Sequence, residues 1–388
     1  MIQSGVRIGR TKGLIIMEDE KFRPVFDGHC DTATRIAADT DFDIGKRHTD
    51  GHIDIPRMKE GGLNVQIFAI HTDPDYPEEL WEEKTFRSIE IFKRAVEANS
   101  EEIKTALRGS DIARVVGGGR IAAVIGVEGG HVVSSLDALE RLYEEGVRCL
   151  TITWKNTNTI ADSSEDRERW GGLSGFGGEI IERMDRLGMI IDCSHASRGA
   201  FFDVLEHSAN PVILSHSCMS ALCDIPRNAD DSQLLALAEN GGVVCVNYFP
   251  AFLEEKSHRD IMKIWSVYRN KKSILSRRYG GDPGRASNEL RWDAIRKLRK
   301  LTMPGLSLVA DHIDHAAGVA GVDHVGIGSD FDGIPLTPSG LDDVSFLPDL
   351  RDELVKRGYS AGDIGKIMGG NLFRVTSTVC GSARSKPS

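Results

Sequence analysis

Basic residues are in the minority in this chain of 388 residues, which has 48 Lys and Arg against 58 Asp and Glu and a formal net charge of -10. An acidic surface disfavours binding to nucleic acid and to anionic lipid. The chain also lacks an apolar run of 18 or more residues, and its first twenty residues lack the apolar centre of a signal peptide. We therefore expect a soluble cytoplasmic protein that binds neither nucleic acid nor membranes.

Cysteine is scarce as well. The sequence has seven cysteines, which is an odd number, and no two of them have the spacing CxxC. Most of them lie within apolar runs. A disulfide framework or a cysteine-rich zinc site has regularly spaced cysteines in polar loops. We therefore expect buried, reduced thiols.

Linkers rich in proline or serine and low-complexity stretches are absent, so nothing in the composition divides the chain. What recurs is a short apolar run rich in β-branched residues, followed by a helical pattern. Continuous apolar runs are typical of parallel strands that are covered on both faces. Eight such runs occur, at residues 24–31, 64–71, 122–129, 148–154, 189–195, 211–217, 242–248 and 324–330.

Helical segments separate most of these runs, among them SIEIFKRAVEANSEEIKTAL at 88–107, and several of the segments end in glycine. Eight strand–helix units predict an α/β fold, the (β/α)8 TIM barrel. An open, doubly wound sheet is the alternative, because periodicity does not show whether a sheet closes. We expect a single barrel domain over 1–388, with an N-terminal extension at about 1–22 and a helical insertion at about 250–305.

Side chains that bind metal ions end five of the eight runs. They are His29, Asp31, Glu128, His195, His216 and Asp330. The carboxyl ends of barrel strands converge on one face of the barrel, where TIM-barrel active sites are built. Each of these residues has a structural explanation when it is considered alone, but six of them at one end of one barrel predict a functional site.

Three histidines and three carboxylates suit Zn²⁺ or a similar divalent ion. A catalytic zinc ion usually takes three protein ligands and a water, so this set is large enough for two ions. Two ions about 3.5–4 Å apart need a bridging group, and Glu128 has two oxygens for this purpose. The resulting assignment is His29, Asp31 and Glu128 on one ion, and Glu128, His195 and His216 on the other.

Seven motifs occur in order along residues 24–375: DGHCDT, VEGG, IIDCSHAS, PVILSHS, PRN, GSDFDG and GGNLFRV. Together they resemble the membrane (renal) dipeptidase family, the M19 metallopeptidases of the amidohydrolase superfamily. The resemblance implies a metal-dependent hydrolase barrel with two Zn²⁺ ions that cleaves dipeptides, and it implies the same five metal ligands. It also implies that Arg227 binds the substrate carboxylate and that Asp330 lies beside the attacking water.

Arg227 has a second interpretation that rests on the residues alone. Asp224, Asp230 and Asp231 lie close to it in the sequence, and ion pairs between loop residues of this kind are common and weak. The family resemblance favours the substrate contact instead.

Two positions depart from the family pattern. Cys30 replaces an asparagine, and strand alternation directs it away from His29, so we interpret it as a packing residue. The strand at 148–154 ends in Trp154, where the best-known members have a histidine that contacts the substrate. Trp154, Lys155 or Asn156 takes over this contact, or the contact is absent and Trp154 is a wall of the barrel mouth.

Three other histidines have weaker claims on function. His71 ends the second apolar run and is a candidate for lining the pocket. His312 and His315 have helical spacing, and we interpret them as structural residues.

The sequence therefore predicts a cytoplasmic zinc dipeptidase in which Asp330 acts as general base and then as general acid. The resemblance implies tolerance of a D residue at the carboxyl end of the dipeptide. An N-acyl amino acid deacylase or a lactonase on the same metal centre is the alternative. A non-catalytic binding protein would have lost a ligand, and none of the five is lost. The oligomeric state stays open, with a homodimer among the alternatives.

Overall fold

The computed structural model describes residues 23–39, 41–278, 297–298 and 300–381. Its parallel strands pair in the order β1-β2-β4-β5-β6-β7-β8-β9, and β9 pairs with β1, so they close into an eight-stranded barrel. The TIM barrel is thereby confirmed and the open sheet is excluded. The strands are β1 (Phe26–Cys30), β2 (Val65–His71), β4 (Ile121–Glu128), β5 (Val147–Thr151), β6 (Ile190–Asp192), β7 (Ile213–Ser217), β8 (Val243–Val246) and β9 (Val325–Ile327).

A ninth strand, β3 (Ile103–Thr105), was not expected from the sequence. It lies within 88–107, which we interpreted as one helix, whereas the helix in this region, α3 (Trp81–Ala98), ends earlier. β3 lies outside the barrel and pairs with the start of β4, with Ile103 opposite Ile121. Ile103 is fully buried. Burial of this side chain and pairing with β4 outweigh the helical propensity of the neighbouring glutamates and lysine.

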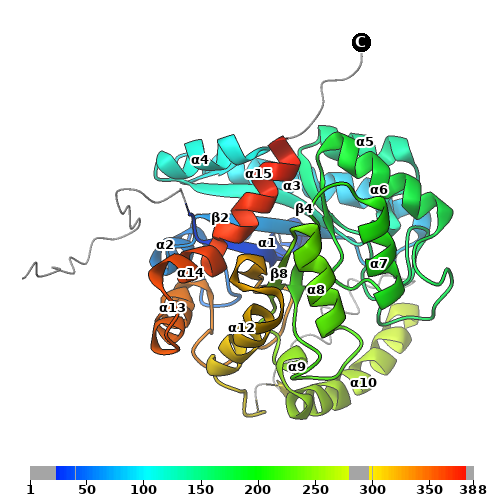
Figure 1. Ribbon diagram of the computed structural model, residues 1–388. Helices are drawn as coiled ribbons and strands as arrows, with labels where there is room; N and C mark the ends of the chain where they lie inside the picture. Colours follow the sequence, from blue (N-terminus) through cyan, green and yellow to red (C-terminus); the bar gives the residue numbers. More distant parts are fainter. Residues whose placement is uncertain (1–22, 40, 279–296, 299, 382–388) are drawn as a thin grey trace, which may run out of the picture.

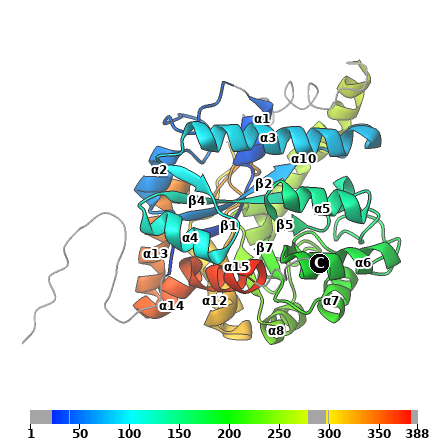
Figure 2. The same ribbon diagram turned by 90° about the horizontal axis from the view of Figure 1, so that it is seen from above.

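Helices surround the strands (Figures 1 and 2). Besides α3, they are α1 (Thr32–Ala38), α2 (Ile55–Gly61), α4 (Gly109–Gly117), α5 (Leu136–Glu144), α6 (Gly175–Leu187), α7 (Arg198–His207), α8 (Asp231–Asn240), α9 (Pro250–Leu253), α10 (Glu255–Arg278), α12 (Ser307–Ala320), α13 (Leu347–Lys356), α14 (Ala361–Gly365) and α15 (Asn371–Gly381). Serine or aspartate side chains cap several of them. Asp230 forms a full capping box with Gln233 at the start of α8.

The barrel core has an inner and an outer apolar layer. Alternate strand residues such as Phe26, Ile190 and Val243 fill the interior, and they pack with Leu372 and Val375 of α15. The other faces of the strands pack against the surrounding helices. Apolar side chains therefore fill the interior, and α15, which lies across the strands in Figure 1, packs against them.

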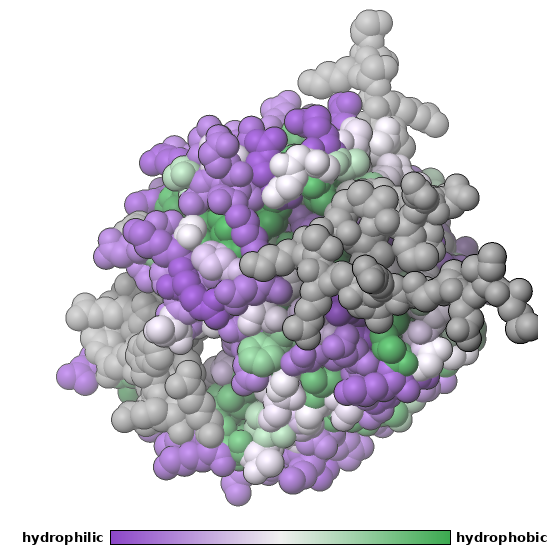
Figure 3. All heavy atoms as spheres, turned by 90° about the vertical axis from the view of Figure 1, so that its left-hand side faces the viewer, coloured by the Kyte–Doolittle hydropathy of each residue, from purple (hydrophilic) through white to green (hydrophobic). Residues whose placement is uncertain are grey.

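The polar residues at the carboxyl ends of the strands lie at the opposite end of the barrel from α15, where a site can form. Part of the expected insertion follows β8 as α9 and α10. Residues 279–296 and 299 of that insertion, and the expected extension at 1–22, lie outside the described residues. Within the described part of the chain, none of the helices combines the length and the apolar character needed to cross a lipid bilayer. The face in Figure 3 is mostly hydrophilic, with small, separated hydrophobic areas.

Candidate metal centre

Glu128 lies at the centre of the predicted cluster. Its Oε1 atom is 3.1 Å from His195 Nε2, 3.4 Å from His216 Nε2 and 3.8 Å from His29 Nε2. These histidines come from β1, β7 and the turn after β6, so the barrel brings together side chains that are far apart in the sequence. All four side chains are at least nine-tenths buried. The three histidines converge on one oxygen of Glu128, rather than dividing between its two oxygens.

Asp31 and Asp330 also lie beside His29. Asp31 Oδ2 is 3.6 Å from His29 Nε2. Two groups of side chains have ligand atoms close enough to hold an ion, namely His29, Glu128 and His216, and His29, Asp31 and Asp330. The five predicted ligands therefore lie in one cluster, together with Asp330, which the sequence interpretation gave a catalytic role and no metal.

The chemistry of the cluster fits divalent ions. His29 Nε2 is buried and has no hydrogen-bond partner among the described residues. His195 Nε2 and His216 Nε2 are only 3.0 Å apart, although both face Glu128. Imidazole nitrogens and carboxylate oxygens in this arrangement are the ligands that zinc and similar metals prefer. Such ions would satisfy His29 Nε2, which no group of the described chain satisfies.

Burial and neighbouring charges shift the pKa values of two carboxyl groups of the site, Glu128 and Asp330, in opposite directions. Burial alone raises the pKa of Glu128, but the neighbouring imidazoles of His29, His195 and His216 outweigh it and hold the pKa well below its usual range. For Asp330, burial dominates and raises the pKa to about 7. Glu128 is therefore suited to remain ionised, whereas Asp330 is suited to exchange a proton near neutral pH.

A buried carboxylate orients His216. Asp192, at the end of β6, accepts hydrogen bonds from Ser215 Oγ at 2.5 Å and from Thr151 Oγ1 at 2.6 Å. Because the only proton of Ser215 Oγ points at Asp192, Ser215 accepts the hydrogen bond from His216 Nδ1 at 2.7 Å. The lone pair of His216 is thereby placed on Nε2, which faces Glu128. Such outer partners fix the tautomer of a metal-binding histidine. The sequence analysis did not identify Asp192 or Ser215.

The backbone at the site is held in an uncommon conformation. His195, Asp330 and Asp332 have φ values of 68°, 61° and 66°. Residues other than glycine adopt such angles rarely, and mainly where the surrounding structure imposes them at functional sites. Asp332 accepts hydrogen bonds from the His52 amide and from Thr32 Oγ1, and it thereby fixes the loop that carries Asp330.

Arg227 lies on the loop after β7 and only 5% of it is exposed. Its Nη1 donates to Ser217 Oγ and its Nη2 to His216 O, both at 2.8 Å, while Nε is buried without a partner. Among the described residues, no carboxylate oxygen forms an ion pair with it. Asp230 pairs with Arg198, and Asp231 pairs with His315. The guanidinium is therefore a buried cation beside the metal cluster, and the loop aspartates do not neutralise it.

Trp154 lies three residues beyond β5 and is half-buried. Its ring packs against His71, with ring centroids 4.3 Å apart, and the ammonium of Lys155 lies 5.1 Å from its own ring. Asn156 has a buried Oδ1 without a hydrogen-bond partner. All three candidates for the missing histidine contact therefore lie at this side of the mouth. Glu165, which the sequence analysis did not single out, lies 3.4 Å from His195 Nδ1.

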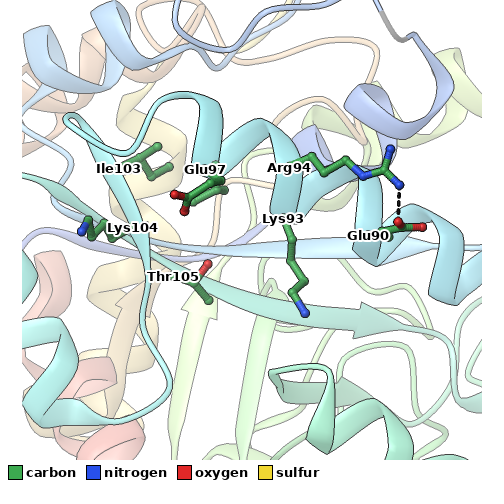
Figure 4. A pocket seen from close by; sticks show the side chains of 8 residues that line it. Glu90, Lys93, Arg94, Glu97, Ile103, Lys104 and Thr105 are labelled. Carbon is green, nitrogen blue, oxygen red and sulfur yellow. Dashed lines mark hydrogen bonds and ion pairs between the residues drawn. The ribbon is translucent and has the colours of Figure 1, made fainter.

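Two surface hollows lie outside the metal cluster. The larger, of about 810 Å³, is formed by the loops after β2, β4 and β5, with Trp81, His131, Asn156 and Trp170 among its lining residues. The smaller, of about 550 Å³, lies between α3 and β3 (Figure 4) and contains the Glu90–Arg94 ion pair. The smaller hollow lies at the start of β4, whereas Glu128 is the last residue of that strand. Because a strand rises about 3.3 Å per residue, this hollow is separated from the metal cluster by the length of β4. Only the larger hollow is near the carboxyl face.

The other two histidines of the sequence analysis have structural partners. His312, in α12, accepts a hydrogen bond from the Met219 amide at Nδ1 and donates one to Leu253 O from Nε2. His315 pairs with Asp231 at 2.7 Å. Both therefore connect α12 to neighbouring segments.

Comparison with known proteins identifies the family of the chain. Residues 19–388 match the membrane dipeptidase family, peptidase family M19. The chain is 34% identical to dipeptidase verJ from Clonostachys rogersoniana over 340 residues, which is 84% of this chain and 76% of that protein. It is 33% identical to dipeptidase aclJ from Aspergillus oryzae over 378 residues, which is 93% of this chain and 79% of that protein. The structure of the probable dipeptidase PvdM from Pseudomonas aeruginosa matches with a TM-score of 0.74 and 28% identity, over 87% of this chain and 91% of that chain.

The barrel and its cluster of imidazoles and carboxylates define a metal-dependent hydrolase. The chain belongs to the membrane dipeptidase family, peptidase family M19, as the sequence motifs indicated, and it is a metal-dependent dipeptidase.

Proposed function

We propose that the enzyme hydrolyses dipeptides with two divalent ions, most suitably Zn²⁺, and that it accepts a D residue at the carboxyl end of the substrate. The observation that best supports a dipeptide is the buried guanidinium of Arg227, which has no ion-pair partner in the described chain. A cation at a fixed distance from the reacting centre suits a substrate whose carboxylate lies one residue beyond the scissile bond. Longer peptides would have to bury further residues at that position.

The ions would be held by His29, Asp31, Glu128, His195 and His216. When bound, they would supply a water activated at neutral pH and a Lewis acid for the scissile carbonyl. Burial lowers the pKa of His216 well below its usual range, which keeps the imidazole neutral, as a metal ligand must be. The Asp192–Ser215 hydrogen bonds then keep its Nε2 lone pair directed at the cluster.

Asp330 would move the proton. Asn247 Nδ2 donates to Asp330 Oδ2 at 3.0 Å and fixes the carboxyl group beside the cluster. With its pKa raised to about 7 by burial, Asp330 can accept a proton from the attacking water and pass it to the leaving amine nitrogen. Arg227 would hold the substrate carboxylate through its free N–H groups.

Tolerance of a D residue rests on membership of the family. We also propose a cytoplasmic location, which is supported by the seven cysteines, all of them buried and without a disulfide. Fractionation of the source cells would test it, and recovery outside the cytoplasm would contradict it.

A substrate panel tests the proposed function. The purified enzyme is assayed on L,L and L,D dipeptides, N-acyl amino acids and lactones, each with and without a chelator. We expect hydrolysis of dipeptides, including L,D members, that the chelator abolishes and added Zn²⁺ restores. Turnover of N-acyl amino acids or lactones in preference to every dipeptide would instead indicate the deacylase or lactonase reaction.

A further inference from the structure

The larger surface hollow has no role in the mechanism above. The loops after β2, β4 and β5 form it at the carboxyl face of the barrel, and its volume is about 810 Å³. Sites for small molecules typically have volumes of about 300–1,000 Å³. The hollow therefore has room for a large amino acid side chain.

Aromatic rings from all three loops form the walls of the hollow. Trp81 follows β2, His131 follows β4, and Trp170 and Phe176 follow β5. Trp81 and His131 meet edge to face, with ring centroids 4.9 Å apart and an interplanar angle of 88°. Edge-to-face contact is a favoured arrangement of aromatic rings, and these walls offer similar contacts to a further ring.

The hydrogen-bond donors of these rings are already used by the protein. The nitrogens Trp81 Nε1, Trp170 Nε1 and His131 Nε2 lie 2.8, 2.8 and 2.9 Å from main-chain oxygens, those of Tyr76, Asn158 and Thr72. Burial lowers the pKa of His131 to about 4, so its ring carries no charge near neutral pH. The walls therefore present mainly uncharged ring surface to a ligand.

Charged side chains lie at the rim of the hollow. Glu78, Glu79 and Arg169 are exposed, and the guanidinium of Arg169 lies 4.3 Å from the ring centroid of Trp170. Because solvent and salt screen exposed charges, the aromatic walls and not the rim determine which side chain the hollow takes.

A row of rings connects the hollow to the metal cluster. The ring centroid of His131 is 6.2 Å from that of His71, and His71 Nδ1 is 3.3 Å from the main-chain oxygen of Glu128. His131 also lies against Gly129, the residue after Glu128. A Cβ atom added to Gly129 would be 2.6 Å from His131 Nδ1 and 3.5 Å from Trp154 Cβ. The hollow therefore adjoins the active site.

The position of Arg227 determines the direction in which a dipeptide would lie. Arg227 follows β7, and β2 is four strands from β7 in either direction around the eight-stranded barrel. A substrate whose carboxylate binds Arg227 and whose scissile carbonyl faces the metal cluster therefore extends its amino-terminal residue towards β2 and β4. Two of the loops that form the hollow follow those strands.

We propose that the hollow is the specificity pocket for the amino-terminal residue of the dipeptide, and that it selects a large aromatic side chain at that position. The inference rests on the proposed dipeptidase function and adds the class of dipeptide on which the enzyme acts best. Burial of a phenylalanine side chain corresponds to a preference of about 10- to 150-fold. For the wild-type enzyme, kcat/KM for phenylalanyl-alanine should exceed that for alanyl-alanine by about this factor.

The variant Gly175→Trp tests the pocket by filling it. Gly175 lines the hollow as the first residue of α6, and a Cβ atom added there would meet nothing within 4 Å outside its own helix and its sequence neighbours. The metal-loaded enzyme is assayed on phenylalanyl-alanine, alanyl-alanine and alanyl-phenylalanine. We expect kcat/KM for phenylalanyl-alanine to fall at least about tenfold, whereas kcat/KM for the other two substrates changes less than about threefold.

Gly117→Trp is the matched control. Gly117 is also a helix glycine with open space where a Cβ atom would lie, but it ends α4, near the start of β4. This variant should leave all three rates unchanged. Trp170→Leu, which removes one aromatic wall, should lower kcat/KM for phenylalanyl-alanine about 2- to 10-fold. Calorimetry with non-hydrolysable mimics of the three dipeptides should give the same order of affinities, and the metal content should be equal in all variants.

The outcomes separate the two proposals. If the wild-type enzyme cleaves no dipeptide, the proposed function fails. If it cleaves alanyl-alanine as well as phenylalanyl-alanine, or if Gly175→Trp slows all three substrates equally, the hollow does not select the amino-terminal residue and the dipeptidase function stands. A loss confined to alanyl-phenylalanine would assign the hollow to the carboxyl-terminal side chain and would also overturn the inference.

Discussion

Replacing Arg227 should separate substrates by their carboxylate. A guanidinium has five N–H donors, and two of them bind Ser217 Oγ and His216 O. Three therefore remain, including the buried Nε–H, which is enough for a two-point contact with a carboxylate. Because charged hydrogen bonds of this kind contribute about 1.5–3 kcal/mol, Arg227→Met should lower kcat/KM for free dipeptides about 10- to 150-fold.

The assay compares each dipeptide with its carboxamide. The carboxamide lacks the negative charge, so it should be a poor substrate for the wild-type enzyme. Its kcat/KM should be nearly the same for Arg227→Met as for wild type. Arg227→Lys should restore little, because an ammonium cannot form two parallel hydrogen bonds. Arg198→Met is the control, since Arg198 is an exposed arginine that pairs with Asp230 on the neighbouring segment. It should leave both rates unchanged.

A structural role for Arg227 would give a different pattern. Its two hydrogen bonds tie the loop to β7, so a residue that only holds the loop would affect every substrate alike. Equal losses for free acids and carboxamides would therefore refute the substrate contact.

Three further predictions follow from individual contacts. Asp330→Asn should keep the bound metal but lower kcat about 10²- to 10⁴-fold; loss of metal along with activity would show that Asp330 is a ligand. Asp192→Ala should weaken metal binding about 10- to 100-fold, measured by competition with a chelator, because His216 loses its orientation; unchanged affinity would contradict this. Burial lowers the pKa of His312 to about 4, against about 6.5 in an unfolded chain. The unfolded state therefore binds more protons below pH 6.5, and stability falls as the pH drops towards 4. Between pH 8 and pH 5, His312→Phe should lose about 2 kcal/mol less stability than wild type in denaturant titrations, and an identical loss would argue against the buried, neutral ring.

The sequence predicted the barrel because its signals are local. Each of the eight continuous apolar runs in the sequence overlaps one barrel strand of the structure. β3 was missed because three residues are too few for a pattern, and its stability comes from pairing with β4. The position of the six polar residues at one face followed from the rule that parallel strand ends meet.

The details of the site depend on contacts between distant segments, which no local pattern encodes. Asp192 reaches His216 through Ser215 on another strand, and the positive φ of His195 is imposed by its surroundings. The isolation of Arg227 from its neighbouring aspartates could not be predicted either, because those aspartates have partners on α7 and α12. Buried polar residues inside apolar runs, such as Asp192, were the one sequence signal that could have indicated the outer network.

The most direct test of the central claim is the metal content of the purified enzyme, measured by mass spectrometry alongside dipeptide hydrolysis as metal is removed and restored. We predict about two divalent ions per chain, most of them zinc, as expected for a two-metal hydrolase. Activity should fall as the ions are removed and return when Zn²⁺ is added. His195→Ala and His216→Ala should lower the metal content and abolish turnover. Full dipeptidase activity in the metal-free protein, or in either variant, would contradict the account.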